Sequence, residues 1–241
     1  MIHRTNSKLY KKAALHDIPQ NTPFIFWDTC ALLDILRIPY RQENVTAALT
    51  TYQQLYELIE NDRIISLTSD MVLYEFNSHF DEISNELSKE VRRLKESIRK
   101  YVALMSDKKK EKISRIIPFF DIASLQSLDS LVRKIWKKTY IIREQCIYRN
   151  MAHTRTVSRI PPAKNKGEYK DCFIWSTFLK YAKDSSSPCK IFFTTNIADY
   201  CNKEAKKIDD FLTQECSRID NAYVYVTSGE VYGKLHRDFG M

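Results

Sequence analysis

The chain has 241 residues, of which 44% are hydrophobic, and this length and composition suit one domain with an insertion or two small domains. The formal net charge of +8 at pH 7 attracts polyanions, of which nucleic acid is the commonest, although a basic and inert surface would give the same number. The six cysteines form no C-x-x-C pair and no zinc-type cluster, and only 4 glycines argue against repeated glycine-rich phosphate loops.

Residues 1–22 are polar and mixed, and we expect a loose lead-in there. The first twelve residues carry charges and lack an apolar run, so they do not resemble a signal peptide. No stretch approaches the roughly 20 apolar residues that a membrane-spanning helix needs. We therefore expect a cytoplasmic protein with reduced thiols and no membrane partner.

The first element is a short run of bulky apolar residues, Phe24–Trp27, which ends at Asp28. A continuous apolar run of this length is typical of a buried parallel strand. A helix should follow and stop before Pro39, because the residue before a proline avoids helical backbone. Apolar residues at helical spacing predict a second helix over about 44–60.

The next strand is predicted at 64–68, and Asp70 is placed to cap the helix that follows, with Glu75 in its first turns. From residue 81 the pattern is long, charged and almost continuously helical. The stretch 89–115 holds eleven Lys and Arg against four Asp and Glu. We predict a basic helical insertion, or a hairpin of long helices, over 81–151.

A loop is predicted over 152–169, where prolines and a glycine break the helical pattern. Strands and helices then alternate again. Helices are expected at 171–181 and about 203–217, strands at 190–195 and 223–226, and a short helix at the end. Such alternation indicates right-handed βαβ units and a parallel sheet, so the fold class is α/β with a core made of 23–80 and 152–241.

Carboxylates follow the predicted strands or open the helices after them: Asp28, Glu75, Asp171 and Asp199, with Asn196 nearby. Ligands of open α/β sheets bind beyond the carboxyl ends of the strands. Clustered carboxylates repel one another unless a proton or cation neutralises them, and hard oxygen ligands suit Mg²⁺ or Mn²⁺. Such ions activate water for phosphodiester cleavage. Singly, each acid could instead be a helix cap, a helix N-terminal acid or a solvated side chain.

Four short motifs, in order, resemble those of PIN domains. An apolar strand ends in Asp28 and Thr before a Leu-rich helix, with Cys30 where Asn is common. Glu75 lies in Val-Leu-Tyr-Glu-Phe, Asp171 opens an amphipathic helix, and the stretch 193–200 has the closing Thr-x-Asn-x-x-Asp pattern. The motifs span about 24–80 and 155–227. The Pro-Pro, Lys-Gly and Asp-x-x-Ile-Trp signature of 159–175 is similar to a larger prokaryotic PIN-like subfamily with a long helical insertion.

The resemblance implies a three-layer α/β/α fold with a central, mostly parallel sheet. It also implies a nuclease, with an endoribonuclease favoured, that uses Mg²⁺ or Mn²⁺. Asp28, Glu75 and Asp171 would be the metal carboxylates and catalytic acids, with Asp199 a fourth and looser one. Three polar residues, Thr29, Thr195 and Asn196, would hold these acids, a water or a phosphate by hydrogen bonds. Glu168 would either approach the metal or simply lie in the loop.

The partner expected from the charge is nucleic acid, with RNA favoured. Residues 131–170 carry eleven Lys and Arg against two Asp and Glu. The cations on and beside the loop that leads to the third acid are expected to grip phosphates, which makes binding strongly salt-dependent. These are Arg155, Arg159, Lys164, Lys166 and Lys170. The interleaved aromatics Trp136, Tyr140, Tyr148 and Tyr169 could stack on bases or form the apolar face of a helix, and Trp136 fits the helix face better.

Two other functions stay open. An inactive PIN-like module would bind nucleic acid or a partner protein without cleaving. A metal-dependent phosphatase on a similar scaffold is disfavoured, because the residue two positions after Asp28 is Cys30 and not a second Asp. The sequence leaves open whether the chain forms a homodimer and which cellular role it serves.

Overall fold

The computed structural model describes residues 11–13, 18–41, 43–104, 127–164, 168–202 and 207–241. A six-stranded sheet lies at its centre with strand order β1-β4-β3-β2-β5-β8, and every neighbouring pair is parallel. The strands are β1 (Lys11–Ala13), β2 (Phe24–Trp27), β3 (Ile65–Ser69), β4 (Tyr140–Ile142), β5 (Lys190–Phe193) and β8 (Ala222–Tyr225). Two further strands, β6 (Cys201–Asn202) and β7 (Lys207–Ile208), form a small antiparallel pair.

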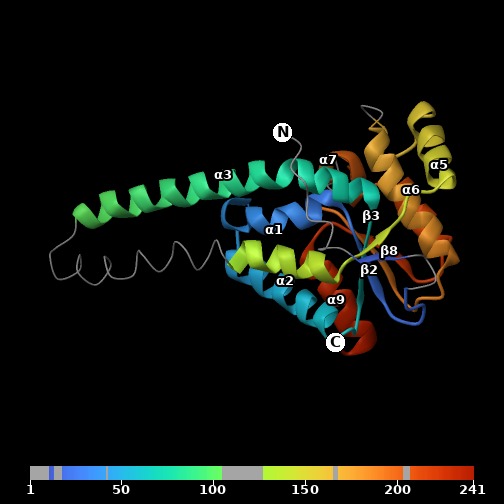
Figure 1. The fold of residues 1–241 in the computed structure, drawn as a ribbon, viewed down its shortest axis with the longest axis horizontal. Coiled ribbons are helices and arrows are strands. Elements are labelled where there is room, and N and C mark those ends of the chain that lie inside the picture. The colour runs from blue at the N-terminus through green and yellow to red at the C-terminus, as the bar shows by residue number, and fades with distance from the viewer. Residues whose placement is uncertain (1–10, 14–17, 42, 105–126, 165–167, 203–206) are drawn as a thin grey trace.

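Helices cover both faces of the sheet (Figure 1). They are α1 (Thr29–Arg41), α2 (Val45–Glu60), α3 (Asp70–Ala103), α5 (Cys146–Val157), α6 (Tyr169–Asp184), α7 (Ile197–Tyr200), α8 (Asp210–Ser217) and α9 (Ser228–Phe239). Residues 127–138 are also helical. The predicted α/β class and the three-layer α/β/α arrangement are therefore confirmed, and the sheet is parallel throughout its described pairs.

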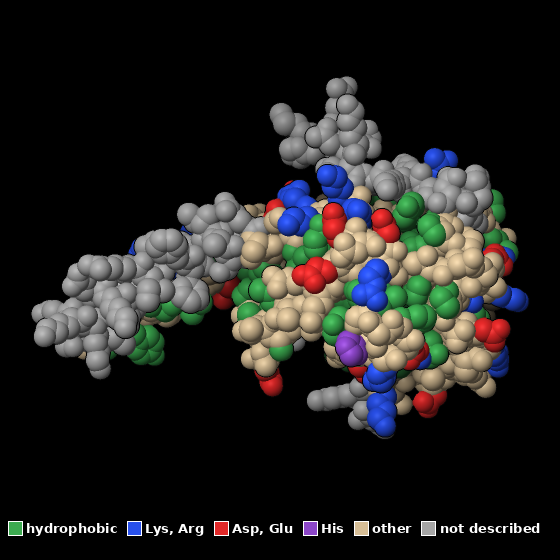
Figure 2. All heavy atoms as spheres, turned by 90° about the horizontal axis from the view of Figure 1, so that it is seen from below, with side chains coloured by type: hydrophobic (Ala, Val, Ile, Leu, Met, Phe, Trp, Pro, Cys, Tyr) green, Lys and Arg blue, Asp and Glu red, His purple; other side chains and the backbone are tan. Residues whose placement is uncertain are grey.

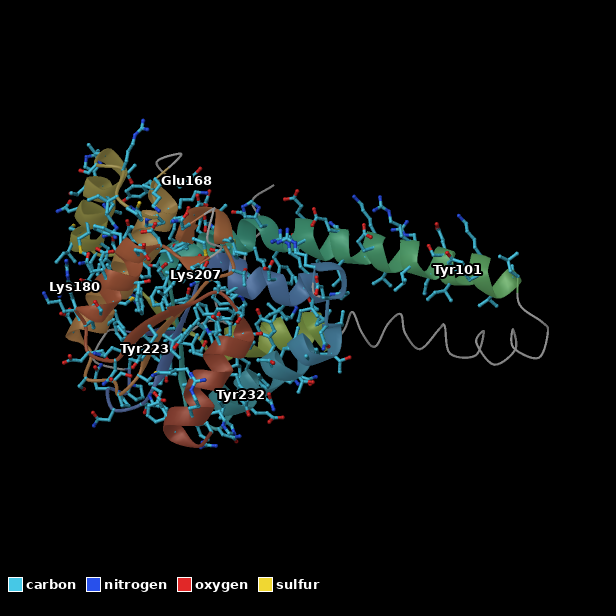
Figure 3. The ribbon with its side chains drawn as sticks, turned by 180° about the vertical axis from the view of Figure 1, so that it is seen from behind. Tyr101, Glu168, Lys180, Lys207, Tyr223 and Tyr232 are labelled. Atoms are coloured by element: carbon cyan, nitrogen blue, oxygen red, sulfur yellow. The ribbon has the colours of Figure 1, made fainter. Side chains whose placement is uncertain are left out.

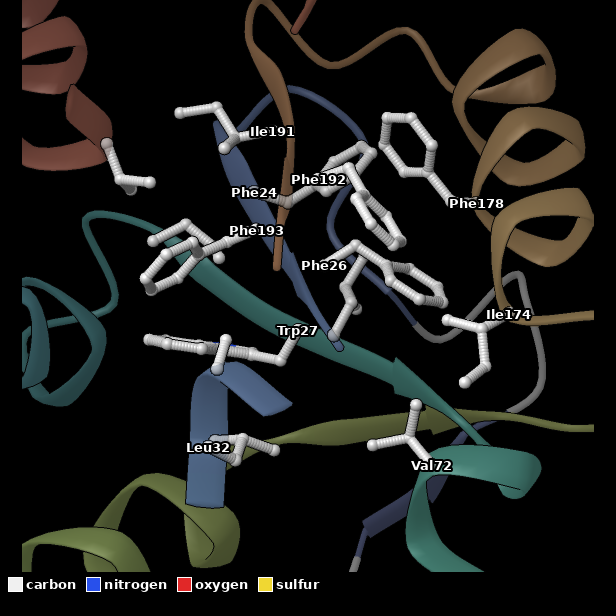
Figure 4. Close-up of a cluster of buried hydrophobic side chains, with 14 of the residues drawn as sticks. Phe24, Phe26, Trp27, Leu32, Val72, Ile174, Phe178, Ile191, Phe192 and Phe193 are labelled. Atoms are coloured by element: carbon white, nitrogen blue, oxygen red, sulfur yellow. The ribbon is translucent and has the colours of Figure 1, made fainter. Parts of the chain in front are cut away.

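The two central strands β2 and β5 are buried along their whole length because each face of the sheet packs against helices. On one face, Phe24 and Phe26 contact Phe178 of α6 edge-on. On the other face Trp27 packs against Phe193, whose ring also lies beside α2. Figure 4 shows these two layers of rings on either side of the strands. An apolar residue at every position of a strand is what two covered faces require.

Helix α3 has 34 residues, a length of about 50 Å at about 1.5 Å per residue. Its first turns pack on the core through Val72, Phe76 and Ile83, and its outer half extends away from the body of the molecule (Figure 1). The cap is Ser69, whose hydroxyl accepts a hydrogen bond from the amide of Val72 at 3.4 Å. The prediction that Asp70 caps this helix was wrong by one residue, since Asp70 is its first helical residue.

The boundaries predicted for the insertion differ from the structure in two ways. Helix α3 runs without a break through residues 80 and 81, because no glycine or proline interrupts it. Strand β4 lies inside the stretch 81–151, yet it pairs with β3 and β1 in the central sheet. A strand of three residues between two helices gives too short a pattern to be recognised. That the remaining helical stretch is an insertion relative to other members of a family stays a prediction.

Local chemistry also explains the other differences. Helix α1 continues through Pro39 to Arg41, since a proline in the last turn removes only one late hydrogen bond. The loop expected over 152–169 begins later, because α5 extends to Val157. Helix α8 begins only at Asp210, after β6 and β7. None of the helices in the described part of the chain is both long and apolar enough to cross a membrane.

Candidate active site

The carboxyl group of Asp28 lies directly beyond the end of β2 and is almost completely buried. Its Oδ1 accepts a hydrogen bond from the backbone amide of Thr29 at 2.7 Å, and its Oδ2 accepts one from the hydroxyl of Thr194 at 2.5 Å. Burial, together with the negative charges of Glu75 and Asp199, raises the pKa of Asp28 to about 7, although the two hydrogen bonds lower it. Within the described residues, no cation is among the groups that shift the pKa of Asp28.

Asp171 lies in the first turn of α6, where the helix opens toward the same edge of the sheet. Burial first, and then the negative charges of Asp28, Asp199, Glu75 and Glu168, raise the pKa of Asp171 to about 8. The amide of Asn196 donates to Asp171 Oδ1 at 3.4 Å. Four carboxylates from four separate segments thus act electrostatically on one another, as the predicted convergence at the sheet edge requires.

Glu75 reaches the same place from the second turn of α3. Its Oε2 accepts a hydrogen bond from the hydroxyl of Thr29 at 2.7 Å, and its Oε1 lies 3.3 Å from the ammonium of Lys170. Both carboxylate oxygens are therefore engaged, one by α1 and one by α6. Thr29 ties Asp28 to Glu75, because its amide contacts the first acid and its hydroxyl contacts the second.

The loop after β5 supplies the remaining polar groups. The amide of Asn196 donates to Asp199 Oδ2 at 2.9 Å, so Asn196 bridges Asp171 and Asp199. The buried hydroxyl of Thr195 has no hydrogen-bond partner among the described residues. Asp199 is partly buried, whereas Glu168, the N-cap residue of α6, is exposed. Glu168 still lies near enough for its charge to raise the pKa of Asp171.

Sequence reasoning gave no role to Thr194, although its hydroxyl makes the shortest described contact to Asp28. The register between β2 and β5 would have shown that Thr194 lies beside Asp28. Phe26 lies opposite Phe192 and Trp27 opposite Phe193, so the residues after these strands, Asp28 and Thr194, are neighbours. The backbone N–H of Asn196 donates to the Thr194 hydroxyl oxygen at 3.0 Å, which fixes the loop against the acid.

The donor chemistry of this cluster fits a hard divalent cation. Carboxylate, amide and hydroxyl oxygens are the ligands that Mg²⁺ and Mn²⁺ prefer. The raised pKa values of Asp28 and Asp171 reflect buried carboxyl groups close to one another, and the Thr195 hydroxyl has no partner among the described residues. Within the described residues, however, no three acidic, His or Cys side chains are arranged to hold one ion. The carboxylate oxygens of the four acids contact polar and basic residues instead: Thr29, Thr194, Asn196 and Lys170.

Arg155 does not lie where a substrate phosphate could contact it. It is buried, and its guanidinium forms a two-pronged ion pair with Glu215 of α8, with Nη1 2.8 Å from Oε1. Its Nε donates to the carbonyl of Pro161 at 3.1 Å, and Trp175 Nε1 donates to Glu215 at 2.9 Å. The prediction that Arg155 grips phosphate was wrong, because this residue joins α5, α6 and α8 inside the protein.

The other predicted phosphate contacts fall into different surroundings. Arg159 is exposed, Lys164 forms an ion pair with Asp209, and Lys170 forms one with Glu75. Lys166 lies outside the described residues. Among the interleaved aromatics, Trp136 and Tyr148 are buried in the core, so neither can stack on a base. Tyr140 and Tyr169 are partly buried and pack against the core.

Comparison with known proteins gives one match. The curated proteins and the solved structures that were searched contain no similar chain at the level required. A family model described as the PIN domain matches residues 25–200, which is well over half of the 241 residues. The matched range begins in β2 and ends at Tyr200, and it contains Asp28, Glu75, Asp171 and Asp199. The chain therefore belongs to the PIN-domain family, a family of nucleases.

Proposed function

We propose that the protein is a metal-dependent endoribonuclease whose Mg²⁺ or Mn²⁺ is held by Asp28, Glu75, Asp171 and Asp199. The observation that carries this proposal is the meeting of four carboxylates from β2, α3, α6 and α7 at one edge of the sheet, where burial raises two of their pKa values. Hard cations bound by such acids supply an activated water and stabilise the leaving oxygen in phosphodiester cleavage.

The protein groups around the acids are suited to hold them in place. Thr194 and the amide of Thr29 fix both oxygens of Asp28, and Asn196 joins Asp171 to Asp199. Acids fixed in this way lose little freedom when a substrate phosphate arrives, so the cost of ordering them is met in folding. Thr195, whose buried hydroxyl has no partner among the residues that the structure describes, is suited to donate to a phosphate or a water.

The decisive experiment replaces Asp171 with Asn and compares cleavage with the parent protein. The variant keeps the shape of the side chain but removes its charge, so we expect at least about a hundredfold loss of cleavage, the size typical of a lost transition-state electrostatic contact. The matched control is Asp184→Asn, the same change at the far end of α6, where Asp184 is exposed and pairs with Lys180. Equal cleavage by Asp171→Asn and the parent would end the proposal.

The substrates should be single-stranded RNA, structured RNA and single-stranded DNA, each with Mn²⁺, Mg²⁺ or EDTA. Adding a circular RNA separates an endonuclease from an exonuclease, because a circle has no end to start from. We expect cleavage of RNA circles with Mn²⁺ or Mg²⁺ and none with EDTA. RNA as the preferred substrate and a cytoplasmic location belong to this proposal, and the six cysteines, none of which forms a disulfide, agree with the latter.

A binding module without catalysis is the second candidate, favoured by two observations. Lys170 neutralises Glu75, and the described acids are not arranged around a single position. This candidate predicts RNA affinity that does not depend on Mn²⁺ and no cleavage of any of these substrates. Size measurement by light scattering in the same preparations would show whether the chain forms a homodimer, which the sequence leaves open.

A further inference from the structure

Lys170 occupies an unusual place for a lysine. It lies in the first turn of α6, beside Asp171, with its ammonium 3.3 Å from Glu75 Oε1. A cation in the first turn is disfavoured by the partial positive charge of a helix N-terminus, so helix stability does not explain a lysine here. The neighbouring acids do, because Asp28, Asp171, Asp199 and Glu75 together concentrate negative charge at this edge.

The contact with Lys170 also accounts for the orientation of Glu75. One oxygen of Glu75 accepts from the hydroxyl of Thr29 and the other faces Lys170, so neither points freely toward the remaining acids. A divalent cation that binds Glu75 must displace the ammonium from the same oxygen or share it. Lys170 is about half exposed, with 48% of its side-chain surface accessible, so its flexible stem has room to swing into solvent.

We propose that Lys170 is the internal counter-ion of the metal-free site and couples metal binding to RNA binding. The proposal rests on the proposed function. In the free protein the ammonium neutralises Glu75 and competes with the cation. When the cation takes its place, Lys170 is released beside the bound strand, and a phosphate of the RNA becomes its new partner.

The competition fixes the sign of the coupling. A phosphate that binds the released ammonium prevents its return to Glu75, so RNA increases the affinity for the metal. By reciprocity the metal increases the affinity for RNA by the same factor. Because partly exposed ion pairs are weak, we expect Lys170 to lower metal affinity in free protein by about fivefold. An arginine at position 170 would keep the charge and thus the coupling.

The test measures Mn²⁺ affinity by the electron paramagnetic resonance signal of free Mn²⁺, so it does not depend on activity. The proteins are the parent, Lys170→Met, Lys170→Arg, Lys180→Met and Asp171→Asn. Lys180→Met is the matched control, since Lys180 lies on the same helix in an exposed pair with Asp184. Each is titrated alone and with a short 2′-O-methyl RNA, which presents phosphates but lacks the reactive hydroxyl groups.

Lys170→Met should bind Mn²⁺ about fivefold more tightly than the parent without RNA, and the added RNA should no longer tighten it. The parent, Lys170→Arg and Lys180→Met should each bind more tightly when the RNA is present. Unchanged or weaker Mn²⁺ binding by Lys170→Met would overturn the coupling and leave the proposed nuclease intact. If Asp171→Asn binds Mn²⁺ as tightly as the parent, the proposed metal site is wrong and both proposals fail.

Discussion

Arg155 has the positive charge expected of a phosphate contact, yet it lies in the interior as the partner of Glu215. The pair is buried between α5 and α8, where the carbonyl of Pro161 accepts a hydrogen bond from Arg155 and the indole of Trp175 donates one to Glu215. Removing one member of such a pair leaves the other charge buried without a partner, which costs about 3–5 kcal/mol.

We therefore predict that Arg155→Met lowers the free energy of unfolding by about 3–5 kcal/mol in urea denaturation. Arg149→Met is the matched control, because Arg149 lies on the same helix in an exposed pair with Glu144. We expect the control to change stability by less than about 1 kcal/mol. A stable Arg155→Met protein with weakened RNA affinity would instead restore the phosphate-binding role that the sequence suggested.

The same residues mark what can be predicted from sequence at this scale. Asp28 and Asp171 stand next to a strand end and a helix start, so local pattern places them at one edge of the sheet. The partner of Arg155 lies 60 residues further along the chain, and no local pattern links the two. Lys170 is similar: its proximity to Glu75 depends on how α3 and α6 meet, which only the folded chain shows.

Helix α3 divides its charges by position. Residues 70–88 contain five Asp and Glu and no Lys or Arg, whereas 89–103 contain six Lys and Arg and two Glu. The acidic part packs on the core and carries Glu75, and the basic part extends outward (Figure 1). Figure 3 shows Tyr101 near the outer end, where its side chain is 68% exposed. A basic, aromatic arm of this kind suits the phosphates and bases of RNA.

We predict that reversing two exposed charges of this arm weakens RNA binding. In Arg92→Glu/Arg99→Glu, affinity for a long RNA should fall at least about tenfold, and the dependence on salt should become shallower because fewer counterions are released. The control is Lys180→Glu/Lys183→Glu at the far end of α6. The measurement is fluorescence anisotropy in EDTA over a range of salt concentrations, so cleavage plays no part. Equal losses in both double variants would show that total charge matters and the arm does not.

Among the elements, length and periodicity decided which ones the sequence revealed. Helix α2 repeats its apolar positions over 16 residues, β2 is a continuous apolar run and β5 holds one from Ile191 to Phe193, so these elements were predicted. Strands β1 and β4 have three residues each and sit at one side of the sheet, which is too few positions for any pattern. The place of β4 depends on pairing with β3 and that of β1 on pairing with β4, and both are long-range contacts.

At the scale of the whole molecule, the charged side chains of both signs are mixed over the surface. On the face seen in Figure 2, basic and acidic side chains are interspersed over the body. The net charge of +8 is thus not spread evenly over the surface. The acidic site lies in a protein whose net charge attracts polyanions. Attraction at a distance and repulsion at the site are compatible only if the acids are neutralised, by protons or by a cation.

Neutralisation by protons has a consequence for stability. The pKa values of Asp28 and Asp171 in the folded protein, about 7 and about 8, lie above the value of 3.8 for a free side chain. Between about pH 4 and pH 8 the folded state therefore holds protons that the unfolded state has released. The free energy of unfolding of metal-free protein falls as pH rises through this window and levels off above it.

We therefore predict that the melting temperature of the protein in EDTA falls from pH 5.5 to pH 8.5, and that Asp28→Asn/Asp171→Asn falls less steeply. At pH 8.5 the double variant should melt several degrees higher than the parent, since about 1 kcal/mol corresponds to about 2–4 °C in a chain of this size. Asp184→Asn should follow the parent. Mn²⁺ should raise the melting temperature of the parent most at high pH, where no proton competes for the carboxylates, and should leave the double variant unchanged. Parallel curves for parent and double variant would mean that these two carboxyl groups are not strained by burial, and the electrostatic basis for a metal at this edge would be lost.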